Sequence, residues 1–181
     1  MAQAAGQDWA QGSVPDMAQL RASARSLLVQ ADRAGMILAT AESCTGGFLA
    51  SLLTDIEGLS HCLDRGFVTY SKAAKQQMLG IGPDLIDRHG AVSEPVARAM
   101  AENSLSRAGC DLSLAITGLA GTPDMEESEG PGVVYVGAAI PSQSWVYRVD
   151  YGQRPRSEVR NLAAFAALTI GIRTVTGRTA D

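Results

Sequence analysis

Residues 36–56 read MILATAESCTGGFLASLLTDI, and this stretch decides the fold. It opens with an apolar run that predicts a strand over 36–40, and it closes with apolar residues at helical spacing that predict a helix over 47–56. Between them, AESCTGG combines one carboxylate, three small side chains that carry a hydroxyl or thiol, and two glycines. A polar turn of this kind, between a strand and a helix, lies where an open α/β sheet binds its ligands.

The alternation of short apolar runs with longer amphipathic runs continues on both sides. It predicts further strands over 66–70 and 112–117 and helices over 16–34, 72–79, 83–88 and 93–108. Two β-rich runs, VVYVGAAI and WVYRVDY, predict an antiparallel hairpin, and a last helix follows over 156–175. We therefore expect an α/β fold, a three-layer sandwich whose mostly parallel sheet carries an antiparallel C-terminal hairpin and has helices on both faces.

Length and composition bound the kind of protein. A chain of 181 residues can bury the core of one domain, which we place over residues 15–181 after a disordered tail over 1–14. The formal net charge of -4 gives no general attraction to nucleic acids or anionic membranes, so we expect neither as a partner. Three cysteines without C-x-x-C spacing, and no signal peptide or apolar span, predict reduced thiols and a cytoplasmic location.

Candidate chemistry begins in the AESCTGG turn. Ser43 or Thr45 could cap the following helix and leave its free amides facing the crevice as an anion or oxyanion site. The alternative is that both residues only cap the helix while the glycines shape a tight turn. Glu42 is either solvated or orients a neighbour.

A second polar segment, TYSKAAK, follows the next predicted strand. Tyr70 ends that strand, and Lys75 lies in the early turns of a helix, where positive charge opposes the macrodipole. A serine nucleophile needs a base, and a desolvated lysine, or a tyrosine held by one, can serve. Ser43 and Lys75 are therefore a candidate pair, although exposed lysines also tolerate such a position.

Other chemistries have less support. Cys44 would need a histidine as base, and the two histidines, His61 and His89, lie elsewhere along the chain, so we expect Cys44 to pack beneath the turn. Scattered histidines give no metal-binding spacing, and no G-x-G-x-x-G opens the fold, so we expect no metal and no organic cofactor. We read the acidic loop over 118–132, GLAGTPDMEESEGPG, as solvated rather than as a cation site.

Five segments, in order along the chain, resemble the C-terminal domain of the competence/damage-inducible CinA family: AESCTGG, GFVTYSKAAKQQMLGI, HGAVSEPVARAMAE, LAITGLAG and GVVYVGAA. The resemblance covers about residues 17–175, and stand-alone members of the family are nicotinamide mononucleotide deamidases. It implies a cytoplasmic amidohydrolase that converts nicotinamide mononucleotide to nicotinate mononucleotide and ammonia. It also assigns the catalytic serine, tyrosine and lysine to Ser43, Tyr70 and Lys75.

The chemistry of amide hydrolysis adds further roles to this assignment. Backbone amides around Thr45, Gly46 and Gly47 could hold the oxyanion, and Tyr70 with Lys75 could move protons to the departing ammonia. In the resemblance, Arg156 and Arg160 match a basic pair common in the family, with Arg154 as an equally good counterpart, and Thr117 and Gly118 match its Thr-Gly after the third strand. The substrate-binding set is thus Glu42, Thr45, Gly46, Gly47, Thr117, Gly118, Arg156 and Arg160.

The long loop departs from the family pattern. Family members usually carry a glycine-rich run with Lys-Pro, whereas this chain reads GTPDMEESEGPG, whose carboxylates would repel a phosphate beneath them. Two alternatives therefore stay open: a non-catalytic nucleotide-binding or regulatory module, and an amidase or esterase for a different small molecule. We also expect a homodimer, because an edge strand or helix face must be covered somewhere.

Overall fold

The computed structural model describes residues 13–121 and 129–177. In chain order the elements are α1 (Met17–Ala34), β1 (Leu38–Glu42), α2 (Phe48–Thr54), the short 3-10 helix η1 (Ser60–Cys62), β2 (Leu63–Val68), α3 (Lys72–Leu79), α4 (Pro83–His89), α5 (Glu94–Ala108), β3 (Leu112–Gly118), β4 (Val133–Ile140), β5 (Gln143–Asp150) and α6 (Arg156–Val175). Of the tail that we expected over 1–14, residues 1–12 lie outside the described ranges, while Val14 packs against the core.

The strands form one five-stranded sheet in the order β2-β1-β3-β4-β5. β1 pairs in parallel with β2 and β3, whereas β4 and β5 extend the sheet as an antiparallel hairpin. The predicted fold class is thereby confirmed. Because of this topology, the carboxyl ends of β1, β2, β3 and β5 meet at one edge of the sheet, where α6 then begins.

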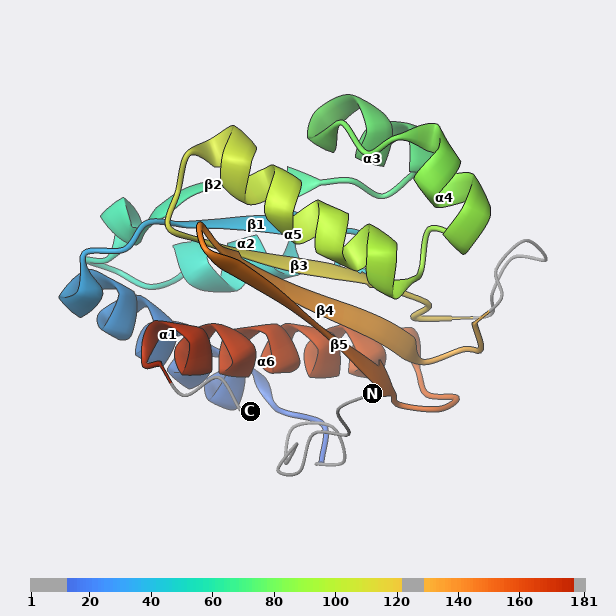
Figure 1. Ribbon diagram of the computed structural model, residues 1–181. Helices are drawn as coiled ribbons and strands as arrows, with labels where there is room; N and C mark the ends of the chain where they lie inside the picture. The colour runs from blue at the N-terminus through green and yellow to red at the C-terminus, as the bar shows by residue number, and fades with distance from the viewer. Residues whose placement is uncertain (1–12, 122–128, 178–181) are drawn as a thin grey trace.

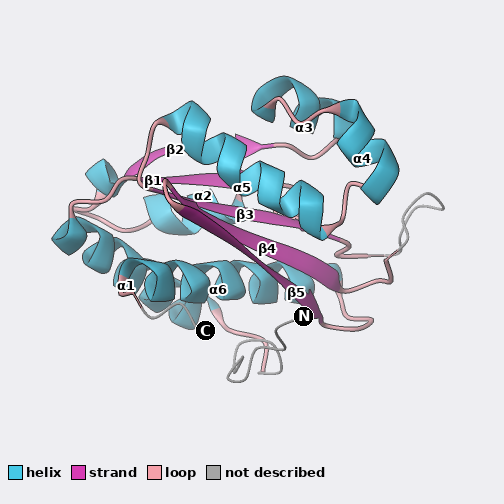
Figure 2. Ribbon diagram, in the orientation of Figure 1, coloured by secondary structure: helices cyan, strands magenta, loops and turns pink. Residues whose placement is uncertain are grey.

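Helices cover both faces of the sheet (Figures 1 and 2). α1, α2 and α6 pack together on one face, and α5 crosses the other face with α3 and α4 against it. α1 shows why: its residues Leu20, Ala24, Leu27, Leu28 and Ala31 recur every three or four positions and are buried. A capping box between Asp16 and Gln19 starts this helix. Within the described ranges, no helix is long and apolar enough to cross a membrane.

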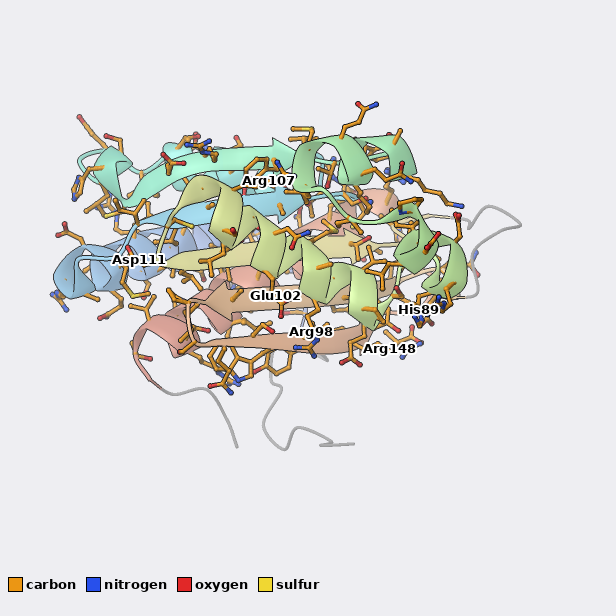
Figure 3. All side chains as sticks on the ribbon, turned by 45° about the horizontal axis from the view of Figure 1, so that its top comes forward. His89, Arg98, Glu102, Arg107, Asp111 and Arg148 are labelled. Atoms are coloured by element: carbon orange, nitrogen blue, oxygen red, sulfur yellow. The ribbon has the colours of Figure 1, made fainter. Side chains whose placement is uncertain are left out.

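On the α5 face, polar contacts tie the helix to the edge strand. Arg98 of α5 donates hydrogen bonds to the backbone and side-chain oxygens of Ser144, and the Ser144 hydroxyl donates to Glu102 at 2.6 Å. Figure 3 labels Arg98 and Glu102 on α5 above the β5 edge. These contacts hold the start of β5 against α5.

Several strand boundaries differ from the sequence expectation, and those of β1 and β2 matter for the site. β1 continues to Glu42 rather than ending at residue 40, because Glu42 is buried and pairs with β2 and β3 as the rest of the strand does. β2 begins at Leu63, three residues early, directly after the unpredicted η1. β2 ends at Val68, so Tyr70 lies beyond the strand that we expected it to end. Ser43 is therefore the first residue beyond β1, at the ligand-binding edge of the sheet.

Candidate active site

Ser43 and Lys75 meet at the end of β1. The Nζ atom of Lys75 donates a hydrogen bond to Ser43 Oγ at 2.9 Å and a second to the carbonyl oxygen of Thr69 at 2.9 Å. Lys75 is 1% exposed and Ser43 is 7% exposed. Burial disfavours the charged form of an amine, and a neutral amine can accept the proton of the serine hydroxyl over the same distance. The pair has the geometry of a nucleophile and its base.

Local structure explains how Lys75 reaches this position. The side chain of Ser71 caps α3 by accepting from the amide of Ala74 at 3.0 Å, so the helix begins immediately beyond β2. The amide of Thr69 donates to the carbonyl of Glu42 at 2.7 Å, which lays the segment before α3 against the end of β1. Lys75, on the first turns of α3, is thereby directed at the residue that follows Glu42.

Glu42 organises the turn that carries Ser43. Its carboxylate is 1% exposed and accepts hydrogen bonds from the amides of Gly47, Leu49 and Ala50 at 3.1, 3.0 and 2.9 Å. We placed Glu42 among the substrate-binding residues, but it lies behind the turn and is not one of the described residues that line the cavity. The sequence left open whether Glu42 is solvated or orients a neighbour. The structure supports the second alternative, because the buried carboxylate holds the amides of the turn.

The prediction that Ser43 or Thr45 could cap α2 is wrong. Neither Ser43 nor Thr45 caps this helix; Gly47 is the N-cap residue and makes no side-chain hydrogen bond, and the Glu42 carboxylate takes the amides instead. Gly46 and Gly47 have φ values of 61° and 90°, a region that favours glycine, so the turn needs both of them. The amides at the start of α2, which we expected to face the crevice, instead donate hydrogen bonds to the buried Glu42 carboxylate.

Few backbone amides near Ser43 are therefore available to bind an oxyanion. The amide of Gly46 donates to the Ser43 carbonyl at 3.0 Å and that of Gly47 donates to Glu42, so two of the three amides that we assigned to the oxyanion already have protein acceptors. Thr45 is fully buried, its hydroxyl has no partner among the described residues, and its carbonyl accepts from Arg160 at 2.8 Å. Cys44, directly after Ser43, does line the cavity.

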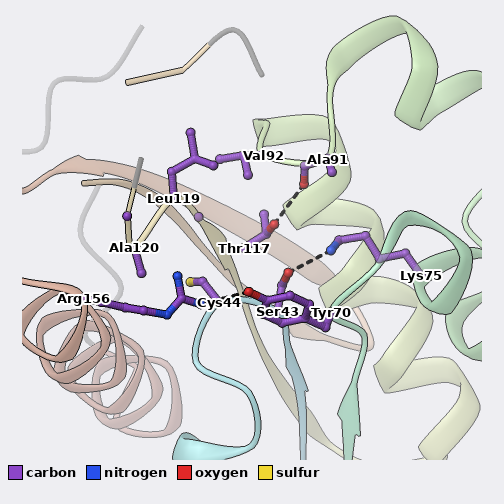
Figure 4. Close-up of a pocket in the computed structure, with 12 residues that line it drawn as sticks. Ser43, Cys44, Tyr70, Lys75, Ala91, Val92, Thr117, Leu119, Ala120 and Arg156 are labelled. Atoms are coloured by element: carbon purple, nitrogen blue, oxygen red, sulfur yellow. Dashed lines mark hydrogen bonds between the residues drawn. The ribbon is translucent and has the colours of Figure 1, made fainter. Parts of the chain in front are cut away.

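A cavity of about 240 Å³ opens over Ser43 (Figure 4). Its described lining residues are Ser43, Cys44, Tyr70, Lys75, Ala91, Val92, Thr117, Gly118, Leu119, Ala120, Gly121 and Arg156. Sequence reasoning identified six of these, namely Ser43, Tyr70, Lys75, Thr117, Gly118 and Arg156. The other six were not assigned to the site from the sequence: Cys44, Ala91, Val92, Leu119, Ala120 and Gly121. Most of them are small or apolar residues, which carry no chemical signal of their own.

Tyr70 and Arg156 stand at the mouth of this cavity. Tyr70 is 62% exposed, and its hydroxyl accepts a hydrogen bond from Arg156 Nη2 at 2.9 Å. We expected Tyr70 to transfer protons together with Lys75, yet its hydroxyl is directed at the arginine (Figure 4). Arg160, unlike Arg156, is not among the described residues that line the cavity. Its guanidinium donates a hydrogen bond to the Thr45 carbonyl and lies 5.6 Å from the centre of the Phe48 ring.

The floor of the cavity is held by Thr117 and Gly118. Thr117 Oγ1 donates to the Ala91 carbonyl at 2.9 Å, which fixes the segment between α4 and α5 over the end of β3. A Cβ atom on Gly118 would lie 2.9 Å from the backbone of Val133 and of Val134, so only glycine fits here. The two residues shape the cavity through packing and backbone contacts.

Electrostatics separate the two candidate nucleophiles. Burial raises the pKa of the Cys44 thiol to about 11, although the positive charges of Lys75 and Arg156 act in the opposite direction. At neutral pH Cys44 is thus a protonated thiol and a poor nucleophile. None of the described lining residues is a carboxylate, so a cavity that contains the Arg156 guanidinium favours an anionic ligand.

Of the four acids in the loop over 118–132, the structure describes only Glu129. Asp124, Glu126 and Glu127 lie outside the described residues. Glu129 accepts hydrogen bonds from Arg148 at 2.8 and 3.2 Å and one from the Tyr135 hydroxyl at 2.5 Å, and the Arg148 guanidinium lowers the pKa of its carboxyl. This one carboxylate of the loop is therefore paired with a cation on β5.

Comparisons with known proteins agree with this architecture. The model of the CinA C-terminal domain matches residues 20–175. A CinA-like protein of Chlorobaculum tepidum is 44% identical over 131 residues, 69% of this chain and 31% of its own length. The crystal structure of the competence/damage inducible protein CihA from Agrobacterium tumefaciens superposes with a TM-score of 0.83 at 32% identity, covering 92% of this chain and 99% of that one.

A second solved structure, the CinA superfamily protein ECK1530/EC0983 of Escherichia coli, gives a TM-score of 0.76 at 34% identity over 93% of this chain and 91% of that one. The chain spans about a third of the length of the curated relatives that it matches first. Family model, sequence identity and fold agree over nearly the whole described chain, and the protein belongs to the CinA C-terminal domain family.

Proposed function

We propose that the protein is an amidohydrolase that removes the amide of nicotinamide mononucleotide, with Ser43 as the nucleophile. The observation that carries this proposal is the hydrogen bond between Lys75 Nζ and Ser43 Oγ, both buried at the edge of a cavity that also holds Arg156. Hydrolysis of a carboxamide needs a nucleophile, a base and an oxyanion donor, and recognition of the nucleotide needs a cation for its phosphate.

In the first half of the reaction, the neutral amine of Lys75 takes the proton of Ser43 while Oγ bonds to the carboxamide carbon. The carbonyl oxygen becomes an oxyanion, for which we assign the amide of Cys44, because the residue after a nucleophile commonly supplies this donor. The carbon–nitrogen bond then breaks, and the ammonium of Lys75 returns its proton to the departing ammonia. The Thr69 carbonyl keeps Nζ in place during both transfers.

In the second half, water replaces ammonia. Lys75 takes a proton from the water, whose oxygen attacks the acyl carbon, and the proton passes to Ser43 Oγ as the acyl–oxygen bond breaks. Nicotinate mononucleotide leaves as the carboxylate. Arg156 at the mouth would pair with the phosphate, since a guanidinium can bind two phosphate oxygens at once. The proposed steps use no metal or organic cofactor.

The cavity volume favours a small substrate. At about 240 Å³ it is smaller than most ligand pockets, which commonly measure about 300–1,000 Å³. A small-molecule amide therefore suits it better than a polymer. The expected homodimer and cytoplasmic location belong to the same proposal.

One observation favours a second candidate, a nucleotide-binding module without turnover. The loop over 118–132 carries the acids Asp124, Glu126, Glu127 and Glu129, where the family resemblance led us to expect Lys-Pro. If this loop covers the phosphate, its charge would weaken binding and leave the Ser43–Lys75 pair without its substrate. An amidase for an uncharged molecule is the corresponding alternative among enzymes.

Ammonia release distinguishes these candidates. We would assay the purified chain with nicotinamide mononucleotide and with nicotinamide riboside, beside Ser43→Ala and the control Ser51→Ala, which changes an exposed serine of α2. The proposal expects turnover of the nucleotide, weak turnover of the riboside, and loss in Ser43→Ala alone. Calorimetric binding of the nucleotide without ammonia release would instead support the binding module, and faster turnover of the riboside would support the other amidase.

A further inference from the structure

A second cluster of reactive side chains lies far from the cavity. Asp32 is in the last turn of α1, and His61 and Cys62 belong to η1, directly before β2. Both segments lead into the amino ends of strands, on the left in Figure 1, whereas Ser43 follows the carboxyl end of β1. The cluster is thus separate from the proposed active site.

The cluster offers one ligand atom of each kind that zinc prefers. A carboxylate oxygen of Asp32, a ring nitrogen of His61 and Sγ of Cys62 all lie within 4.8 Å of one another. Oxygen, nitrogen and sulfur ligands are bound by Zn²⁺ at about 2.0–2.3 Å, which places tetrahedral ligands roughly 3.3–3.6 Å apart. The sequence did not suggest this site, because Asp32 lies 29 residues before His61.

Small movements would complete this geometry. Asp32 Oδ1 and His61 Nε2 are 2.7 Å apart, so a metal ion between them needs a separation only slightly larger. Their side chains are 49% and 62% exposed and can adjust, while Cys62 is 1% exposed and fixed beneath them. A rigid buried sulfur below two adjustable surface ligands leaves the fourth position open to water.

Charge also favours a cation here. The carboxylate of Asp32 lies at the C-terminal end of α1, where the helix dipole is negative. A divalent ion would stabilise a thiolate at Cys62 and neutralise the Asp32 carboxylate.

We propose that Asp32, His61 and Cys62 form a binding site for a thiophilic divalent metal ion of the zinc type. The ion would join the end of α1 to the start of β2, and it would protect a thiol that has no part in the proposed hydrolysis. This inference does not depend on the proposed function. The competing explanation is a surface ion pair between Asp32 and His61, in which Cys62 takes no part.

Cobalt is the probe that separates the two explanations. Co²⁺ bound tetrahedrally by a thiolate gives an intense near-ultraviolet charge-transfer band, which an oxygen and nitrogen site lacks. The chain, free of any histidine tag, would be titrated with Co²⁺ and compared with Cys62→Ser, His61→Gln and Asp32→Asn. Cys110→Ser and His89→Ala are matched controls, since they change the same residue types outside the cluster.

We expect one equivalent of Co²⁺ to produce the band, and Zn²⁺ to displace it. Cys62→Ser should abolish the band, His61→Gln and Asp32→Asn should weaken Zn²⁺ binding by at least roughly tenfold, and both controls should bind normally. Zn²⁺ should also raise the melting temperature of the unaltered chain and of both controls, but not that of Cys62→Ser. No band, or a band that survives in Cys62→Ser, overturns the proposal. Because His61 is exposed, His61→Gln keeps the test valid even if Cys62→Ser fails to fold.

Discussion

The carboxylate of Glu42 accepts a hydrogen bond from the amide of Ala50 at 2.9 Å, and this contact joins the last residue of β1 to the first turn of α2. Ser43 lies between the two elements, so its position depends on a buried carboxylate that lies behind the turn. The proposed nucleophile is held from behind by Glu42 and approached from the front by Lys75.

Glu42→Gln should therefore lower both stability and turnover. A glutamine keeps one accepting oxygen but presents its NH2 group to amides that need an acceptor, which costs about 1–3 kcal/mol of unfolding free energy. Denaturant unfolding measures this loss, and steady-state kinetics should show a fall in kcat with a smaller change in KM. The exposed Glu57→Gln is the control, and a change confined to KM would contradict the assigned role of Glu42.

Replacing Lys75 by Met should lower kcat strongly without unfolding the protein. A buried amine is costly to desolvate, whereas a methionine of similar length packs well, so we expect the melting temperature to hold or rise. Loss of a general base lowers kcat by about 10²–10⁴-fold. Activity that persists in Lys75→Met would remove the lysine from the mechanism.

Arg156→Ala should affect the phosphorylated substrate selectively. A charged hydrogen bond contributes about 1.5–3 kcal/mol, so KM for nicotinamide mononucleotide should rise roughly 10- to 150-fold while kinetics with the riboside stay nearly the same. Arg154→Ala is the control, because the side chain of Arg154 binds the Tyr151 carbonyl and lies 3.5 Å from Glu158. Equal effects on both substrates would show that Arg156 does not recognise the phosphate.

Tyr70→Phe tests which task the tyrosine performs. Its hydroxyl is exposed and bonded to Arg156, so its removal should raise KM for the nucleotide severalfold and leave kcat nearly unchanged. Substrate saturation curves separate the two constants. A hundredfold fall in kcat would place Tyr70 in proton transfer, as we expected from the sequence.

Glu129→Gln should reduce stability only above acidic pH. Arg148 lowers the pKa of the folded Glu129 carboxyl below its unfolded value of 4.5, so the pair stabilises the fold above that value and loses its effect as pH falls through the folded pKa. The loss at pH 7 should be about 0.5–1 kcal/mol, because the pair is partly exposed. Chemical unfolding at neutral pH and at about pH 3 measures it; an equal loss at both would indicate packing rather than charge.

Much of the architecture follows from the sequence. The alternation of apolar runs predicts that the ends of β1 and β2 share one edge, and this brings Ser43 and Lys75 near each other although 32 residues separate them. Resemblance to the family selected Arg156. Each of these predictions rests on a signal that lies within one short stretch of the sequence, either an apolar pattern or a motif.

The remainder depends on contacts between segments. Glu42 resembles a loop carboxylate in the sequence, and only the folded chain supplies the three amides that make its burial favourable. The contact between Tyr70 and Arg156 spans 86 residues, and the cluster at His61 needs Asp32 from a different helix. Such pairings follow from how helices pack on the sheet, which residue spacing does not encode.

The burial of Lys75 has a consequence for spectroscopy. The sequence contains two lysines, Lys72, which is half-buried, and Lys75, which is almost fully enclosed. Isotope labelling of lysine would therefore give two side-chain signals, and Lys72→Arg would leave a single resonance that reports on the proposed base alone. Its chemical shift during a titration would reveal directly when that amine carries its proton, in the intact protein and without any substrate.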